Sequence, residues 1–113
     1  MVHELKIYPE YLKEVLSGDK TFEVRKNDRP YTIGDTIHFR EFNKESNEYG
    51  AIEADYIISY ILCDGEYVKD GFVVLGIKPC DMKRSLSLYM AWDILHNKEK
   101  NNNGWYKEYS INH

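Results

Sequence analysis

Short segments in which apolar and polar residues alternate, separated by turn residues, restrict the fold of this chain more than any other feature. Alternation sends successive side chains to opposite faces, which is the pattern of a β-strand with one buried face. It predicts five strands, at residues 2–8, 21–25, 36–42, 51–62 and 71–77. Many short strands at such close spacing favour a small mixed barrel over an open sheet.

One short helix is expected between the first two strands. Pro9 suits a first helical position, apolar residues follow at helical spacing, and Ser17 and Gly18 supply a stop. The fold class is therefore predicted as α+β, with a small barrel over residues 1–80. Residues 81–113 are expected to form a C-terminal extension, because the residue pattern and the charge balance both change there.

The extension is expected to begin with a helix over about residues 85–97, followed by an irregular tail. Ser85 can cap this helix, and large apolar residues follow at helical spacing. Trp92 and Leu95 are expected to lie back on the barrel, since an isolated helix would leave them exposed. A homodimer formed through this helix is the alternative.

The charge balance limits the classes of partner. The 113 residues carry a formal net charge of −4, and residues 1–80 hold 10 basic against 15 acidic side chains. Proteins that grip long duplex DNA without sequence preference present a broadly basic surface, which this chain lacks. A nucleic-acid role would therefore need a local patch or pocket.

Targeting and metal signals are both missing from the sequence. No apolar run approaches the 20 residues of a membrane span, and the first residues lack the basic head and apolar block of a signal peptide. We therefore expect a cytoplasmic protein without a membrane partner. Cys63 and Cys80 have no further ligands at metal-binding spacing, so we expect no metal and no cofactor.

The segment around residues 17–29 carries the densest chemistry. A turn delivers Lys20 to the start of a strand whose outward face is expected to repeat Glu23 and Arg25. Arginine offers a flat fork of five donors, lysine a point charge, and glutamate an acceptor that can also hold the arginine in position. Such a group can bind a polar ligand. The alternative is a solvated strand face with cross-strand ion pairs that each contribute little.

Gly18, Lys20, Glu23 and Arg25 stand at the spacing of a GxKxxExR signature. In this signature the chain resembles ASCH domains, a branch of the PUA-like superfamily, and more specifically the DUF3850 group of that branch. The resemblance extends over about residues 2–79. The flanking motifs that agree are His3 to Ile7, Lys26 to Arg29, Gly34 with Asp35, and Gly71 to Ile77.

The resemblance implies a PUA-like barrel of five or six strands, with a cleft for single-stranded RNA or a nucleotide-like small molecule. Readers of single-stranded RNA rely on aromatic stacking and base-edge hydrogen bonds, so an acidic chain can serve. We expect a monomer or weak homodimer of bacterial or phage origin. Carried over by position, the cleft residues are Lys20, Glu23 and Arg25, with Lys6 and Tyr8 on the preceding strand and Lys26, Asn27 and Arg29 at the mouth.

The resemblance also leaves an enzyme open. One ASCH branch removes the acetyl group from N4-acetylcytidine with a threonine nucleophile beside the signature lysine. This chain has Glu23 at the threonine position, and the nearest hydroxyl, on Thr21, stands elsewhere in the signature. Lys20 and Glu23 would be catalytic only in such a hydrolase or in a ribonuclease, as acid and base. We favour a binding module without catalysis, and a protein-interaction role of the C-terminal helix is the third hypothesis.

Two histidines in the strands have structural interpretations. His3 shares the apolar face of the first strand with Leu5 and Ile7, so we expect a hydrogen-bonded residue of the core or its rim. His38 alternates with apolar neighbours and is expected on the surface of its strand.

Overall fold

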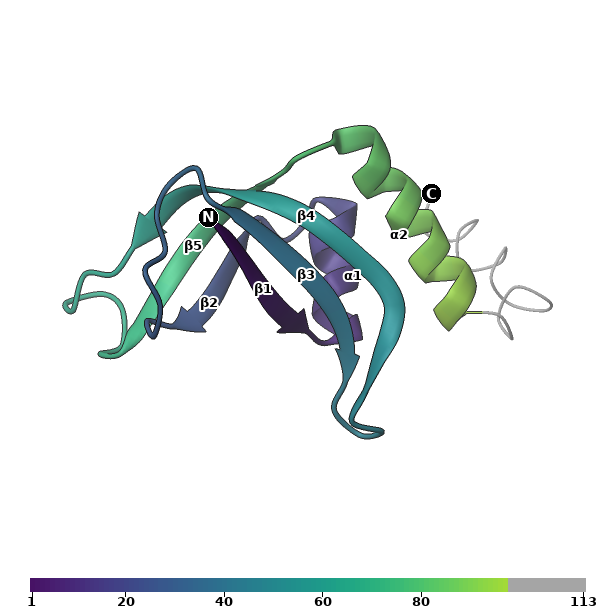
Figure 1. Ribbon diagram of the computed structural model, residues 1–113, viewed down its shortest axis with the longest axis horizontal. Helices are drawn as coiled ribbons and strands as arrows, with labels where there is room; N and C mark the ends of the chain where they lie inside the picture. Colours follow the sequence, from purple (N-terminus) through teal and green to yellow (C-terminus); the bar gives the residue numbers. More distant parts are fainter. Residues whose placement is uncertain (98–113) are drawn as a thin grey trace.

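A computed structural model describes residues 1–97, so the expected irregular tail lies outside the described residues (Figure 1). Within that part the chain forms five strands and two helices. In chain order they are β1 (Val2–Ile7), α1 (Pro9–Ser17), β2 (Phe22–Lys26), β3 (Thr36–Asn43), β4 (Glu48–Leu62), β5 (Phe72–Pro79) and α2 (Met82–His96). The predicted α+β class, with five strands and an early helix, is confirmed.

The five strands form one mixed sheet in the order β1-β3-β4-β5-β2. β1 and β3 run parallel, and the other neighbouring pairs are antiparallel. The first two strands therefore lie at opposite edges of the sheet, joined by α1. The sheet curls so that these edges turn toward each other, and the result is a half-barrel with α1 inside its curve (Figure 1).

The core lies on the concave face of the sheet. Inward positions of β1, β3, β4 and β5 supply buried apolar side chains, among them Leu5, Phe39, Ile58 and Leu75. Burial of each such side chain contributes about 1.5–3 kcal/mol relative to exposure. His3 is also buried on this face, 3% exposed, with its Nε2 2.8 Å from Asp35 Oδ2. The expectation of a hydrogen-bonded core histidine is confirmed.

Helix α1 closes one end of the core. Leu12, Val15 and Leu16 are buried at helical spacing, which gives the helix one apolar stripe toward the sheet. Gly18 ends the helix in the left-handed region, with φ of 88°, where glycine carries no steric penalty. The chain then turns directly into the signature segment.

Strand β2 faces the opposite way from the expectation. Its polar stripe points into the half-barrel, so Glu23 is only 4% exposed, whereas Phe22 is 46% and Val24 53% exposed. The pairing with β5 sets this orientation, because Glu23 lies opposite the buried Leu75. The expected outward polar face is therefore wrong, and the signature residues line the interior.

Two arginines bridge the open edges of the half-barrel. Met1 O accepts from Thr36 N of β3, so alternation turns the carbonyls of Glu4 and Lys6 away from β3. Arg25 Nη2 donates to Lys6 O at 2.8 Å, and Arg29 Nη1 donates to Glu4 O at 3.5 Å. These side chains occupy acceptors on an edge strand that would otherwise be open to another chain.

Helix α2 begins earlier than expected. Its N-cap is Asp81, which accepts a hydrogen bond from Arg84 N at 3.1 Å. Ser85, the expected cap, lies one turn inside the helix, where its buried hydroxyl contacts Tyr56 Oη and Leu16 O. The predicted cap and start are thus wrong, because the hydroxyl of Ser85 is used in a tertiary contact.

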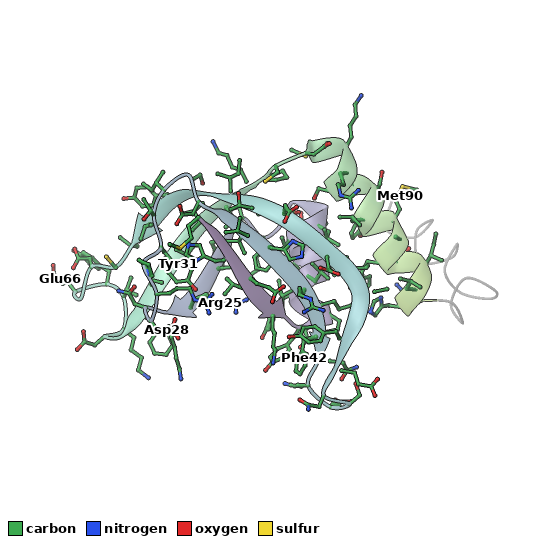
Figure 2. The ribbon with its side chains drawn as sticks, viewed as in Figure 1. Arg25, Asp28, Tyr31, Phe42, Glu66 and Met90 are labelled. Atoms are coloured by element: carbon green, nitrogen blue, oxygen red, sulfur yellow. The ribbon has the colours of Figure 1, made fainter. Side chains whose placement is uncertain are left out.

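Only one side of α2 is packed. The helix contacts α1 and β4, and Trp92 is 7% exposed, as expected. Leu95, which was also expected to pack, is 47% exposed. Figure 2 shows Met90 on the outer side of the helix. The exposed apolar residues at four-residue spacing are Met82, Leu86, Met90 and Ile94.

Candidate functional site

The signature residues line a cavity of about 440 Å³ inside the half-barrel, which we call the signature cavity. It lies between the start of α1 and the inward face of β2. Its volume falls within the usual range for small-molecule sites. The lining residues are Ile7, Tyr8, Tyr11, Lys20, Glu23, Val24 and Arg25.

Glu23 lies between the two cations of the signature. Lys20 Nζ pairs with Glu23 Oε1. On the other side, Arg25 Nε and Nη2 lie 3.0 and 2.9 Å from Glu23 Oε2. A carboxylate this buried needs such partners, because an unpaired charge in the interior is strongly destabilising. The alternating spacing of β2 and the turn at Gly18 bring all three groups together.

Lys20, Glu23 and Arg25, which we call the triad, have hydrogen-bond donors left over but no readily available acceptor. Each oxygen of Glu23 already faces a cation, while Arg25 Nη1 has no hydrogen-bond partner among residues 1–97. Lys20 Nζ has three hydrogens and one hydrogen-bond acceptor within the described chain. With two cations against one carboxylate, the formal charge of the triad is +1. The signature cavity is therefore suited to an acceptor-rich or anionic ligand.

Two tyrosines form an aromatic wall beside the triad. The ring centroids of Tyr8 and Tyr11 are 6.3 Å apart, with an interplanar angle of 33°. The side chains are part of the open surface, since Tyr8 is 36% and Tyr11 50% exposed. Lys20 Nζ lies 5.0 Å from the Tyr11 ring centroid. A flat ligand can stack on such rings while it reaches the donors of the triad.

Half of the expected site residues meet in this cavity. Lys20, Glu23, Arg25 and Tyr8 do, but Lys6 does not. Leu5 and Ile7 point inward, so Lys6 points outward, where its Nζ lies 4.4 Å from the Phe42 ring centroid. Tyr8 escapes this alternation because β1 has ended and Tyr8 is already the N-cap residue of α1.

The three residues expected at the mouth do not line the cavity either. Lys26 and Asn27 are exposed, and Asn27 N donates to Gly71 O at 2.9 Å. Arg29 lies near the Tyr31 ring, 5.9 Å from its centroid, and bonds the edge of β1. These residues therefore serve the loop after β2 and the sheet edge.

Sequence reasoning missed Tyr11. This residue lies three positions after Tyr8, and residues at that spacing are neighbours on one side of a helix. The sequence placed Tyr8 at the end of the first strand, so this relation becomes visible only with Tyr8 as the N-cap residue of α1. The helical spacing groups Tyr11 with the apolar residues that follow it, although its side chain is 50% exposed.

Two other titratable clusters lie away from the signature cavity. The hydrogen bond from His3 is the main cause that lowers the pKa of the Asp35 carboxyl below its usual value. On the surface of β3, hydrogen bonds to Asp55 and then Glu53, both at 2.6 Å, raise the pKa of His38. No group of three or more potential metal ligands is found within residues 1–97. No helix of the described part has the length and apolarity to cross a membrane.

Comparison with known proteins gives a family and one phage relative. Residues 2–77 match the family model described as "Domain of unknown function (DUF3850)". A segment of 41 residues is 44% identical to the "Uncharacterized 12.9 kDa protein in GpA 3'region" of Escherichia phage P2. This match covers 36% of the present chain and 38% of the phage protein.

Proposed function

The chain belongs to the DUF3850 family, and from that premise we propose that its signature cavity binds single-stranded RNA or a nucleotide-sized ligand. The observation that carries the proposal is the buried Glu23 carboxylate with Lys20 and Arg25 on either side. This arrangement fixes both cations and leaves their other donors toward the cavity. Phosphate oxygens and base carbonyls are acceptors of the kind that such donors bind.

The aromatic wall supplies the second half of the recognition. A base can stack on Tyr8 or Tyr11 while its edge or its phosphate meets Lys20 and Arg25. We further propose that the half-barrel is of the PUA-like type and of the ASCH branch. The inward GxKxxExR residues and the mixed five-stranded sheet support this assignment.

The charge of the whole chain fits a small site better than a long duplex. The net charge is −4, and the triad contributes only one positive charge to its surroundings. We therefore expect weak binding to long duplex DNA and a shallow dependence of affinity on salt, since few phosphates are neutralised. Recognition would depend on one or two nucleotides held in the cavity.

Calorimetric titration with uridine 5′-monophosphate and with a single-stranded RNA octamer tests the proposal. We expect Lys20→Met to weaken binding about tenfold, because it removes a charged donor while keeping the length of the side chain. Lys83→Gln on the exposed surface of α2 removes the same charge outside the cavity and should leave binding unchanged. Equal affinities of wild type and Lys20→Met for both ligands would overturn the assignment.

A hydrolase is the second candidate, favoured by the direct contact of Lys20 with Glu23 in a cavity. Thr21 lines a different, mostly apolar cavity together with Gly18 and Pro79, so water would be the nucleophile. Incubation with N4-acetylcytidine separates the two functions. Release of acetate that is lost in Lys20→Ala would establish catalysis, and its absence at high protein concentration would leave the binding module.

A further inference from the structure

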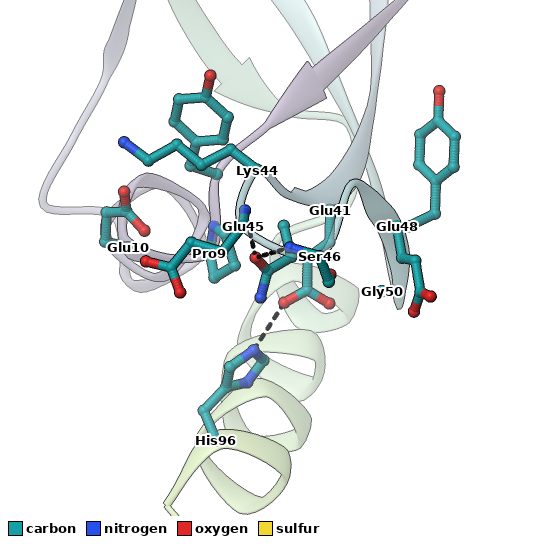
Figure 3. Close-up of a pocket in the computed structure, with 12 residues that line it drawn as sticks. Pro9, Glu10, Glu41, Lys44, Glu45, Ser46, Glu48, Gly50 and His96 are labelled. Carbon is teal, nitrogen blue, oxygen red and sulfur yellow. Dashed lines mark hydrogen bonds and ion pairs between the residues drawn. The ribbon is translucent and has the colours of Figure 1, made fainter.

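A second cavity, of about 450 Å³, shares Tyr8 with the signature cavity and is otherwise separate from it. We call it the Glu41 cavity. Its walls come from the start of α1, the end of β3, the hairpin loop that follows, and His96 in the last turn of α2 (Figure 3). The signature sequence and the proposed nucleotide function do not account for it.

Glu41 stands where the alternation of β3 calls for an apolar residue. Ile37, Phe39 and Glu41 are consecutive inward positions, and none is more than 4% exposed. The register between β3 and β4 shifts beside Glu41, between Arg40 and Phe42. Irregularities of this kind re-aim side chains at the rims of barrels. The carboxylate is therefore held in the wall of the cavity by the strand itself.

The facing strand makes room for this carboxylate. A β-carbon on Gly50 of β4 would overlap the end of the Glu41 side chain, beginning with Oε1. The backbone of Gly50 is not in the left-handed region, so glycine is favoured here by the space it leaves for the Glu41 side chain and not by backbone freedom. Glu41 and Gly50 are thus complementary positions.

His96 is held in a fixed orientation beside Glu41. His96 Nδ1 lies 2.8 Å from Trp92 O, which can only accept, so Nδ1 carries a hydrogen. His96 Nε2 lies 2.7 Å from Glu41 Oε2. The imidazole is fixed by stacking on Trp92, with centroids 4.1 Å apart and planes within 9°.

The hydrogen-bonding capacity of Glu41 is nevertheless mostly unused. Its side chain is 5% exposed, and its Oε2 lies 2.7 Å from His96 Nε2 without an aligned hydrogen bond. Oε1 has no hydrogen-bond partner within residues 1–97, and Glu41 is one of the residues that line the cavity. Buried carboxylates are rarely left in this condition, so the position calls for an additional donor.

We infer that the Glu41 cavity binds a small organic cation through a primary ammonium group, with Glu41 as its acceptor. An ammonium group supplies three donors for the carboxylate oxygens that have no aligned hydrogen bond within residues 1–97. The Tyr8 ring in the same wall already has an ammonium near its face, since Lys44 Nζ lies 5.0 Å from its centroid. The charged lining residues are acidic in excess, with Glu10, Glu41, Glu45 and Glu48 against Lys44 and His96.

Calorimetric titration of the full chain with putrescine at low salt tests the inference. We expect saturable binding that Glu41→Gln weakens about tenfold or more, as for the loss of a charged hydrogen bond. Glu66→Gln removes the same charge from a loop at the other end of the molecule (Figure 2) and should change affinity less than about twofold. Equal weakening by both variants, or no binding to the wild type, would overturn the inference.

Two further arms keep the test decisive if Glu41→Gln folds poorly. His96→Phe preserves the stacked ring but removes the group that competes for the carboxylate, so putrescine should bind more tightly than to wild type. Tetramethylammonium carries a charge but no N–H donor, so it should bind more weakly than putrescine. Loss of putrescine binding in His96→Phe, or equal affinity for the two cations, would contradict the role of Glu41.

Discussion

The signature cavity and the Glu41 cavity each contain a buried glutamate at an inward strand position, yet they differ in how that carboxylate is satisfied. Glu23 has a cation against each oxygen, and what remains unused are donors. Glu41 has one close contact, to His96 Nε2, without an aligned hydrogen bond, and what remains unused is an acceptor. The negative charge of the buried glutamate therefore does not decide which ligand its cavity suits. The unused hydrogen-bonding capacity decides it.

The largest expected difference between the two regions is in stability. Glu23→Gln breaks a buried pairing of two cations and should lower the free energy of unfolding by about 3 kcal/mol. Glu41→Gln replaces a poorly compensated carboxylate with a neutral amide and should cost less than about 1 kcal/mol. Urea unfolding of wild type and both variants at pH 7 measures the two changes in the free energy of unfolding. Equal costs would mean that Glu41 is as well satisfied as Glu23, and the comparison would fail.

The second test concerns the space that Gly50 leaves for Glu41. Gly50→Ala should cost about 1–3 kcal/mol, because the new methyl group overlaps a side chain that is buried. In a Glu41→Ala background the same substitution should be nearly neutral. A double-mutant cycle by urea unfolding gives the coupling energy directly. Additive effects of the two substitutions would show that the carboxylate does not lie over Gly50.

A third carboxylate, on Asp35, lies outside both cavities and is hydrogen-bonded to His3, so it serves as a reference for a well-satisfied carboxylate. The pKa of this group is lowered in the folded state, chiefly by the hydrogen bond from His3. Its contribution to stability is therefore present above its ordinary pKa near 3.8 and lost as pH falls through the lower folded value. The stability difference between wild type and Asp35→Asn should narrow on acidification from pH 6 to pH 3. A constant difference over that range would contradict the pairing.

The smallest effect is expected from the exposed cluster around His38. Hydrogen bonds to Asp55 and Glu53 raise the pKa of His38. Its contribution to stability is therefore present below about pH 6.5 and lost as pH rises through the pKa of the folded state. The side chain of Asp55 is 53% exposed and that of Glu53 49%, so solvent screening limits the contribution to a few tenths of a kcal/mol. His38→Gln should flatten this limb of the stability profile between pH 5.5 and pH 9. An unchanged limb would assign it to another group.

Alternation was sufficient to predict the strands, and apolar residues at helical spacing predicted the first helix, because buried apolar stripes determine both. It was misleading for β2, where Phe22 and Val24 are apolar and yet lie outside. The pairing with β5 places Glu23 opposite the buried Leu75, and this orientation is visible only when the register between the two strands is known.

The errors in the residues predicted for the candidate site and for the second helix have similar causes. Lys6 was assigned to the cleft by position, but alternation with Leu5 and Ile7 sends it to the other face. Ser85 is a residue type that commonly caps helices, but its hydroxyl forms a hydrogen bond with Tyr56 Oη instead. Glu41 carried a usable signal, since it continues the apolar face of Ile37 and Phe39. A charged residue in that register is the pattern that a buried functional carboxylate leaves in a sequence.

The most direct test of the central claim is a pair of amide NMR titrations of the ¹⁵N-labelled full chain, one with uridine 5′-monophosphate and one with putrescine. The different unused groups in the two cavities predict separate responses. The nucleotide should shift the amides of Tyr11 and of residues 20–25, while the amine should shift those of Glu41, Gly50 and His96. Both ligands perturbing the same amides, or the two sets being exchanged, would contradict the account.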